Sequence, residues 1–247
     1  MNSNFLNLTP KEHGLTIYRI IPIARLVDLY KTKRSALTRT YKWDDPWENF
    51  LLRSPARLHG EKITFGFHNN FFGQCWSYLN ESDAMWRIYS NHKARNEGVK
   101  LQTTVGKLFD SLFNSSAVVN REISCFIGKV EYSDIPLLHT SIKTSFLLQS
   151  SGAGLAKTLL TKRTAFEHEH EIRLLFFDTT STKTGDLMFY EVEPNKLFEE
   201  VVLDPRLDPK QRERSEKRLR RAGCTLPINQ STLYQLPNFE FILDDDS

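Results

Sequence analysis

Residues 169–177 read EHEIRLLFF, and this stretch decides the fold of the chain. Its apolar and aromatic run is typical of a β-strand, so we predict a strand over 171–177. Alternate residues of a strand point to the same face, which would place Glu169 and Glu171 side by side. An edge strand that carries a ladder of charges, with Arg173 next in line, is the alternative interpretation.

A strand that leads directly into a helix is predicted near the N-terminus. Residues 15–21, LTIYRII, are apolar enough for a buried strand and carry the pair Tyr18-Arg19. Pro22 suits the first position of a helix, and residues 23–30 have apolar side chains at helical spacing. We therefore expect Arg19 to lie near the end of a strand that feeds a helix.

A third segment brings a serine and several large aromatic side chains together. Residues 74–78 predict a strand that contains the motif CWS at residues 75–77. Ser82 can cap a following helix that carries Trp86 and Tyr89 on one face.

The other predicted elements alternate between strands and helices. A mostly helical segment is expected over 140–166, with a break at the glycines of 152–154. Capped helices are expected after Thr103 or Thr104 and from Asp208 to just before Gly223. This mixture predicts an α+β fold in a single domain, 1–247, with a core of about 15–243 and short tails, the C-terminal one acidic. The remaining strands are predicted over 62–67, 99–101, 123–132, 187–192, 200–203 and 239–243.

Size and composition are typical of a soluble protein. The 247 residues can bury roughly 70–75% of the surface of the unfolded chain, so no disulfide or metal is needed for folding. No N-terminal segment resembles a signal peptide, and no apolar run approaches the ~20 residues that span a bilayer. We therefore expect a cytoplasmic protein with no membrane partner.

The cysteines and histidines do not predict a metal site. Cys75, Cys125 and Cys224 are far apart and lack CxxC spacing, which favours reduced thiols; a nucleophilic Cys75 is a minor alternative. His168 and His170 could share a strand face, but no further histidine or cysteine lies nearby to complete a zinc site.

A basic segment precedes the C-terminus. Residues 204–221 contain eight Lys and Arg against four Asp and Glu, whereas the whole chain has a net charge of only +3. A solvated helix face is one interpretation, and a patch for the phosphates of RNA or DNA is the other.

Four motifs together resemble a large bacterial family of unknown function. They are W-x-D-P-x-E at residues 43–48, C-x-S at 75–77, M-W-x-x-Y at 85–89 and E-x-E-x-R at 169–173. The resemblance covers roughly residues 15 to 210. This resemblance implies little about the reaction or the roles of individual residues. The two tryptophans of the first motif predict either a pocket wall or a loop held against the core by its indoles.

A more distant resemblance supplies the chemistry. Tyr18-Arg19 before a helix, a strand that ends in Ser77, and EHE at 169–171 resemble the Arg–Ser–Glu layout of the ADP-ribosyltransferase superfamily. Bacterial members that modify nucleic acids follow the Glu strand with Val-x-Pro and another strand, which here correspond to 192–194 and 200–203. The sequence departs from the superfamily in its second motif, where CWS replaces Ser-Thr-Ser or a tyrosine. The resemblance implies a split mixed β-sheet core with flanking helices, and NAD as the donor of ADP-ribose.

The resemblance also implies roles for individual residues. Glu171 would stabilise the positive charge that develops on the ribose, and Glu169 would orient or deprotonate the acceptor. Arg19, beside Tyr18, would hold the pyrophosphate or a ribose as a bidentate donor. Ser77 would fix the nicotinamide ribose. Stacking on nicotinamide is expected from the aromatic side chains Trp76, Trp86 or Tyr89.

The function implied is a NAD-dependent ADP-ribosyltransferase that modifies nucleic acid. A toxin of a toxin–antitoxin or phage-defence system is expected, with a protein antitoxin as a possible partner. Two alternatives stay open. A non-enzymatic module could stack a base between Trp43, Trp47, Trp76 and Trp86. A metal-dependent nuclease could use carboxylates from two segments, Asp44, Asp45, Glu48, Glu169 and Glu171.

Overall fold

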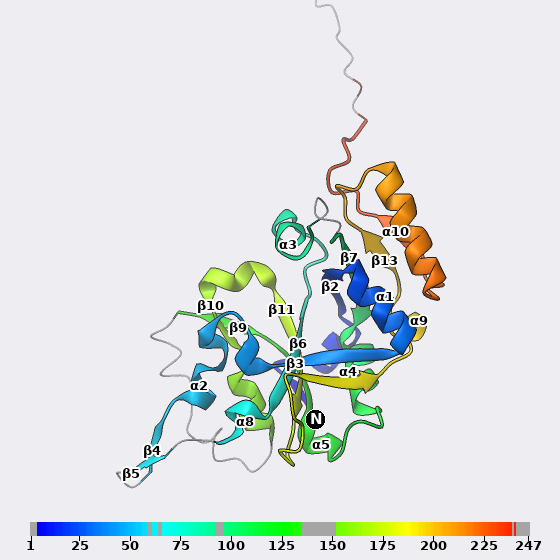
Figure 1. Cartoon of the computed structure of the whole chain (residues 1–247). Helices are drawn as coiled ribbons and strands as arrows, with labels where there is room; N and C mark the ends of the chain where they lie inside the picture. Colours follow the sequence, from blue (N-terminus) through cyan, green and yellow to red (C-terminus); the bar gives the residue numbers. More distant parts are fainter. Residues whose placement is uncertain are drawn as a thin grey trace, which may run out of the picture.

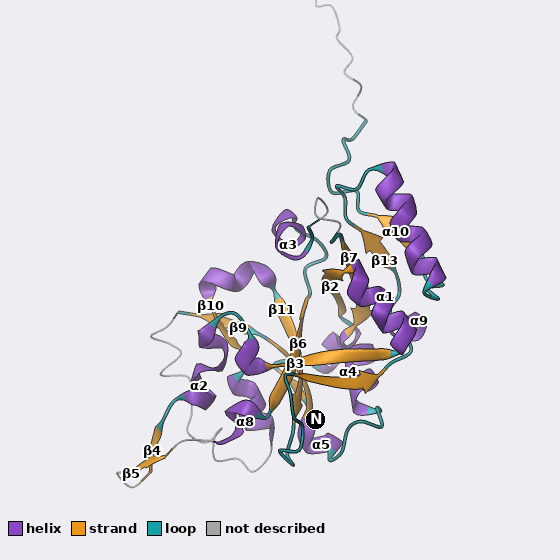
Figure 2. Cartoon of the chain, in the orientation of Figure 1, coloured by secondary structure: helices purple, strands orange, loops and turns teal. Residues whose placement is uncertain are grey.

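The computed structural model describes residues 4–58, 61–63, 66–91, 96–134, 152–238 and 240. Strands β11 and β6 run through the middle, with α1 and α10 on one side and α2 and α8 on the other (Figure 1). Helices surround the strands (Figure 2), so the α+β fold class is confirmed. None of the described helices is long and apolar enough to cross a membrane.

The described strands form one large sheet and two small ones. The order in the large sheet is β1-β8-β11-β6-β2-β7-β13-β14, and β3 joins β12 to β6 in a second branch. The small sheets pair β10 with β9 and β4 with β5. The strands are β1 (Phe5–Leu6), β2 (Thr16–Pro22), β3 (Arg34–Arg39), β4 (Ala56–Leu58), β5 (Glu61–Ile63), β6 (Phe71–Ser77), β7 (Gly98–Thr104), β8 (Cys125–Lys129), β9 (Glu131–Ser133), β10 (Thr161–Arg163), β11 (Glu171–Phe177), β12 (Leu187–Glu191), β13 (Val201–Leu203) and β14 (Ile228–Gln230).

The sheet is split where β2 meets β6. Within the described residues these two strands pair only at Tyr18 and Ser77, whereas β2 pairs with β7 along its whole length and β11 pairs with β6 from end to end. Parallel and antiparallel pairs occur in the same sheet. The predicted split mixed sheet is therefore confirmed.

Strand β11 is central because both of its faces meet apolar side chains. Ile172, Leu174 and Phe176 belong to one hydrophobic cluster, and Leu175 belongs to a second cluster on the other face. Its neighbours β6 and β8 pair with it on both sides, so the edge-strand interpretation is wrong. A strand buried on both faces has a nearly continuous apolar sequence, as EHEIRLLFF has after Glu171.

The helices cover the apolar edges of the sheet, and the predicted caps are confirmed. Ser82 accepts a hydrogen bond from Met85 N, Thr104 accepts one from Lys107 N, and Asp208 forms a capping box with Gln211. The helices are α1 (Ile23–Thr32), α2 (Phe50–Arg53), α3 (Asp83–Tyr89), α4 (Val105–Phe113), α5 (Arg121–Ser124), α8 (Gly152–Thr158), α9 (Pro194–Leu197) and α10 (Pro209–Arg221), with 3₁₀ turns at Pro10–Gly14, Thr40–Lys42, Pro46–Asn49, Gly66–Asn69 and Thr164–Glu169.

The segment before β11 differs from its prediction. The residues predicted to break a helix at 152–154 begin helix α8 instead. A Cβ added at Gly152 would lie 2.5 Å from the Ile123 carbonyl oxygen, so close packing rather than a chain break explains this glycine. Residues 161–163, predicted to be helical, form β10, and residues 140–151 of the predicted helix lie outside the described residues.

Two predicted strands are shorter than expected and one is not described. Helix α5 takes up the beginning of the strand predicted over 123–132, and β5 ends at Ile63 before a 3₁₀ turn. The strand predicted over 239–243 lies outside the described residues, except for Glu240, which has no regular structure.

Candidate active site

Strand register brings the three sequence motifs to one place. Tyr18 of β2 pairs with Ser77 of β6, and Ser77 pairs with Glu171 of β11. Arg19 follows Tyr18 directly, so the Arg, Ser and Glu motifs lie abreast on three neighbouring strands. They meet at the split in the sheet.

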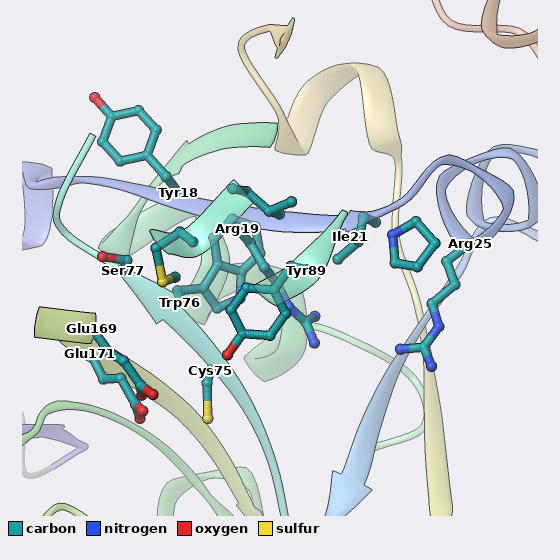
Figure 3. Close-up of a pocket in the computed structure, with 13 residues that line it drawn as sticks. Tyr18, Arg19, Ile21, Arg25, Cys75, Trp76, Ser77, Tyr89, Glu169 and Glu171 are labelled. Atoms are coloured by element: carbon teal, nitrogen blue, oxygen red, sulfur yellow. The ribbon is translucent and has the colours of Figure 1, made fainter. Parts of the chain in front are cut away.

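A cavity of about 160 Å³ opens at this point. Seven of the eight predicted site residues line it, and Cys75, Met85 and Arg25 complete much of the rest. Figure 3 shows the two carboxylates close together on one side, the guanidinium groups of Arg19 and Arg25 on the other, and the Tyr89 hydroxyl directed between them. The predicted residues in the lining are Tyr18, Arg19, Trp76, Ser77, Tyr89, Glu169 and Glu171.

The acidic wall of the cavity is built around a buried lysine. The Lys162 side chain is only 6% exposed, and its Nζ lies 2.6 Å from Glu169 Oε2, 2.6 Å from Glu171 Oε1 and 2.9 Å from Glu48 Oε1. Strand β10 places this lysine against the two glutamates that line the cavity. One ammonium group therefore holds three carboxylates from three separate segments.

A second buried cation lies behind Glu171. Arg173 Nε donates to Glu171 Oε2 at 2.6 Å, its Nη2 donates to Glu48 Oε1 at 2.7 Å, and its Nη1 donates to the Leu159 carbonyl oxygen at 2.7 Å. Its guanidinium lies 4.6 Å from the centre of the Trp43 ring. Each nitrogen of this fully buried side chain donates a hydrogen bond to the protein, so Arg173 holds Glu171 in place, and it does not line the cavity.

The charges of this cluster separate the two glutamates. Two cations, Lys162 and Arg173, face three carboxylates, so one carboxyl group carries excess negative charge. Burial, and next the neighbouring Glu171, raise the pKa of Glu169 to about 7. The cations Arg173 and Lys162 outweigh burial at Glu171 and hold its pKa well below the usual range. Near neutral pH the site therefore has one fixed anion and one group able to exchange a proton.

The prediction that Glu169 and Glu171 share one face of a strand is wrong, although both side chains bind Lys162 and line the same cavity. Glu169 ends a 3₁₀ turn, and His170 adopts a left-handed conformation with φ of 46° before β11 begins. His170 Nδ1 lies 3.1 Å from the Tyr78 hydroxyl. The turn at His170, together with Lys162, brings the two carboxylates to the same cavity.

Arg19 has the opposite character from Arg173. Among the described residues it has no hydrogen-bond or ion-pair partner, and its only contact of note is the Trp76 ring, 6.0 Å from its Cζ. Burial lowers the pKa of this half-buried guanidinium. A buried charge without a counter-ion is costly, so Arg19 is suited to receive an anionic group from a ligand.

The other predicted residues fall into different environments. The Ser77 hydroxyl accepts a hydrogen bond from Leu79 N and faces the cavity. Trp76 is buried, and its indole N–H donates to Gln74, so it supports Arg19 rather than presenting a free face. The Tyr18 ring contacts Lys100 and points away from the carboxylates in Figure 3. Tyr89, at 44% exposure, forms the outer edge.

Trp86 does not belong to the cavity lining. It is fully buried, and its indole N–H donates to Glu81 at 2.6 Å. Its predicted stacking on nicotinamide is therefore wrong, because the helical stripe that suggested it packs into the core. Cys75 lines the cavity, but burial and then Glu171 raise the pKa of its thiol, which disfavours a nucleophilic role.

The aromatic loop at 43–48 is held against the protein. Trp43 packs beneath Arg173 and against Gly73, where an added Cβ would lie 2.5 Å from the indole. Neither Trp43 nor Trp47 lines the cavity, so the four-tryptophan base-stacking site does not form.

The carboxylates of the nuclease alternative meet only in part. Glu48, Glu169 and Glu171 converge on Lys162, whereas Asp45 pairs with Arg163. Within the described part of the chain, no group of three His, Cys, Asp or Glu has the geometry to hold a metal ion. The Lys162 ammonium group lies between Glu48, Glu169 and Glu171, where a divalent cation bound by these carboxylates would have to lie.

Sequence reasoning missed Lys162 and Arg25. Lys162 lies in a segment predicted to be helical, and no spacing relates it to Glu48, which is more than a hundred residues away. Arg25 lies on the polar side of α1, where helical periodicity predicts only a solvent-exposed residue. That periodicity could not show that the Arg25 side chain reaches the cavity.

No protein-family model matches the chain, and no curated protein matches it. Among solved structures, the chain is similar to DarT of Thermus sp. 2.9. The complex with NAD+ has a TM-score of 0.40 at 9% identity and covers 88% of this chain and 96% of that chain. The complex with ADP-ribosylated ssDNA has a TM-score of 0.40 at 9% identity, with coverages of 92% and 97%. The bacterial family of unknown function stays a prediction.

Proposed function

We propose that this protein is a NAD-dependent ADP-ribosyltransferase whose acceptor is nucleic acid. One observation carries the proposal: the Arg19 guanidinium, which has no partner among the described residues, shares a cavity with the Glu169–Glu171 pair. A cation for phosphate and a fixed anion for an electron-poor ribose are the two requirements of this reaction.

A second cavity supports a dinucleotide as the ligand. The first cavity, about 160 Å³, is small for one, but a neighbouring cavity of about 440 Å³ shares Arg19, Ile21 and Arg25 with it. Arg19 and Arg25 thus border both spaces, which suits a pyrophosphate between two nucleosides. In the second cavity Phe189 is 40% exposed and could support a base by stacking.

The proposed reaction assigns separate tasks to the two glutamates. The bond between nicotinamide and ribose breaks, nicotinamide leaves with the electron pair, and an acceptor atom forms the new bond to the ribose carbon. Glu171 stays ionised and stabilises the positive charge that develops on the ribose. Glu169 takes the proton that the acceptor loses.

The test is incubation with NAD labelled in its adenylate phosphate, together with total cell RNA, DNA and protein. Single-stranded DNA is included as a separate acceptor because one DarT structure contains ADP-ribosylated ssDNA. Label in a nucleic acid supports the proposal. Label in protein alone would support transferase activity but contradict nucleic acid as the acceptor. If no acceptor led to nicotinamide release, both the transferase activity and the nucleic-acid acceptor would be contradicted.

Replacing Arg19 should weaken ligand binding without lowering the stability of the free protein. We expect Arg19→Met to weaken ADP-ribose binding by about 10- to 100-fold, since a charged hydrogen bond to the pyrophosphate is lost. The melting temperature of the free protein should be unchanged or higher, because the variant removes an uncompensated charge from the cavity wall. Calorimetric titration and thermal unfolding measure the two effects.

Arg212→Met is the matched control, because Arg212 is exposed on α10 and lies outside both cavities. Equal binding by the Arg19 variant and the wild type would remove Arg19 from the site. A clear drop in melting temperature for Arg19→Met would point to a structural role instead.

The raised pKa of Glu169 predicts a pH dependence of transfer. A general base must be deprotonated, so the single-turnover rate should rise by about tenfold from pH 6 to pH 8, with a midpoint near 7. The Glu169→Gln variant should be slower, and its rate should not show this rise between pH 6 and pH 8. A rise that persists unchanged in Glu169→Gln would assign the titration to another group.

The toxin role and a protein antitoxin remain part of the proposal. Expression of an active transferase that modifies nucleic acid should arrest growth, and Glu171→Ala should relieve the arrest. Toxicity that persists in this variant would exclude the proposed chemistry as its cause.

A further inference from the structure

Helices α1 and α10 border a groove in which six of the nine lining residues are basic. Its volume is about 680 Å³, and its apolar lining residues are Val27 and Ala222. The charged side chains at its rim are Lys31, Lys210, Glu213, Arg214, Lys217, Arg218 and Arg221. The groove is separate from the candidate active site, although α1 borders both, with Arg25 on one side and Lys31 on the other.

The structure divides the basic residues of 204–221 into those with partners and those without. Arg206 pairs with Asp204, and Arg220 donates to two backbone carbonyl oxygens, so both hold the fold. Lys217 pairs with Glu213 at 2.6 Å. The other groove cations, all exposed and without a hydrogen bond or ion pair among the described residues, are Lys31, Lys210, Arg214, Arg218 and Arg221.

The four cations of α10 that line the groove and have no partner among the described residues form a row along one side of the helix. Lys210, Arg214, Arg218 and Arg221 are spaced four, four and three residues apart, so they share a face over about 16 Å at 1.5 Å per residue. Complementation of the helix dipole explains cations only in the last turn. Lys210, in the first turn, lies at the end where the dipole disfavours a cation, and like charges four apart repel.

We propose that this groove binds the phosphate backbone of a nucleic-acid strand. A row of about 16 Å matches roughly five nucleotides of one strand at 3.4 Å each. A membrane surface fits less well, because helices that lie on a bilayer need an exposed apolar face. The buried side chains of α10, Ser215 and Leu219, face the protein instead.

The groove contributes affinity without sequence preference, since phosphate contacts carry no base information. It also gives the protein a second contact with a polymer at a distance from the carboxylates. The inference does not depend on the transferase reaction, because binding can be measured with NAD absent.

The test compares two triple variants of the full chain. Arg214→Gln, Arg218→Gln and Arg221→Gln together remove three groove cations, whereas Lys11→Gln, Lys196→Gln and Arg212→Gln remove three exposed cations elsewhere. Fluorescence anisotropy measures binding of labelled single-stranded DNA and RNA at several salt concentrations. The groove variant should bind at least about tenfold more weakly at low salt, and its slope of log K against log salt should fall by about 2, at ~0.7 per lost phosphate contact.

Other outcomes would overturn the proposal. If both triple variants lost the same affinity, the effect would come from net charge and not from the groove. If the groove variant bound as well as the wild type, the groove would have no role in binding. Binding to vesicles of anionic lipid but not to the oligonucleotides would assign the surface to membranes. The melting temperature of the groove variant should be close to that of the wild type, which shows that the variant is folded without relying on the transferase reaction.

Discussion

Glu171→Gln is expected to slow nicotinamide release by about 10²- to 10³-fold. The substitution keeps the size of the side chain and removes the fixed negative charge beside the cavity. The pKa of Glu171 lies well below the usual range, so the wild-type carboxylate is ionised at every pH at which the enzyme would be assayed. The lost rate therefore measures the electrostatic stabilisation of the ribose cation.

The fold should survive this substitution. Lys162 keeps Glu48 and Glu169, and Arg173 keeps Glu48 and the Leu159 carbonyl. The two cations then face two carboxylates, so the pKa of Glu169 should fall toward its usual range. The residual rate of this variant should therefore no longer rise with pH near 7.

Glu199→Gln is the matched control for Glu171→Gln. Glu199 is also ion-paired, to Lys107 at 2.9 Å, but it lies outside the cavity. Its substitution should leave the rate unchanged. A Glu171→Gln enzyme with wild-type rate would remove the carboxylate from the chemistry.

Lys162→Met should destabilise the protein by roughly 3–5 kcal/mol at pH 8, as loss of one partner does in a buried ion pair. The lysine is 6% exposed and contacts Glu48, Glu169 and Glu171, so its removal leaves only Arg173 to balance three carboxylates. Urea unfolding measures the free energy of unfolding of the variant and the wild type.

The loss should depend on pH in a defined direction. Without Lys162 the pKa of Glu169, which burial already raises, should rise further above that of the unfolded chain. The variant is therefore relatively more stable below the unfolded pKa, and it loses stability as the pH rises through the raised pKa. The difference from wild type should be smaller at pH 5 than at pH 8.

A surface lysine provides the comparison. Lys107→Met breaks the exposed pair with Glu199, in which both side chains are at least a third accessible, and should cost under about 1 kcal/mol. The triple variant Lys162→Met, Glu48→Gln, Glu169→Gln should recover part of the loss. Equal stability of Lys162→Met and wild type would show that the ammonium group is not needed to hold the carboxylates.

The sequence predicted the strands better than the contacts between them. EHEIRLLFF predicts a buried strand because apolar side chains on both faces leave a continuous run, and the caps at Ser82 and Asp208 follow from local hydrogen bonds. The resemblance then placed Arg19, Ser77 and Glu171 in one site, and they do line one cavity.

The errors come from tertiary packing, which local sequence patterns do not encode. Trp86 shares a helical stripe with Tyr89, but Trp86 is fully buried whereas Tyr89 is exposed. Lys162 has no local signal, since its three partners come from the 3₁₀ turns that contain Glu48 and Glu169 and from β11. Helical periodicity could not show that Arg25 reaches a cavity shared with β2 and β6.

The single residue pair between β2 and β6 has a mechanical consequence. Arg19 lies on the β2 side of that junction, and Glu171 lies on β11, beyond β6. Rotation about this residue pair would change the separation between Arg19, the proposed phosphate-binding cation, and Glu171, the proposed reacting carboxylate, while the other strand pairs stay intact. Binding of the donor and cleavage of its nicotinamide–ribose bond would then both depend on this one rotation. A tightly bound pyrophosphate would prevent the rotation.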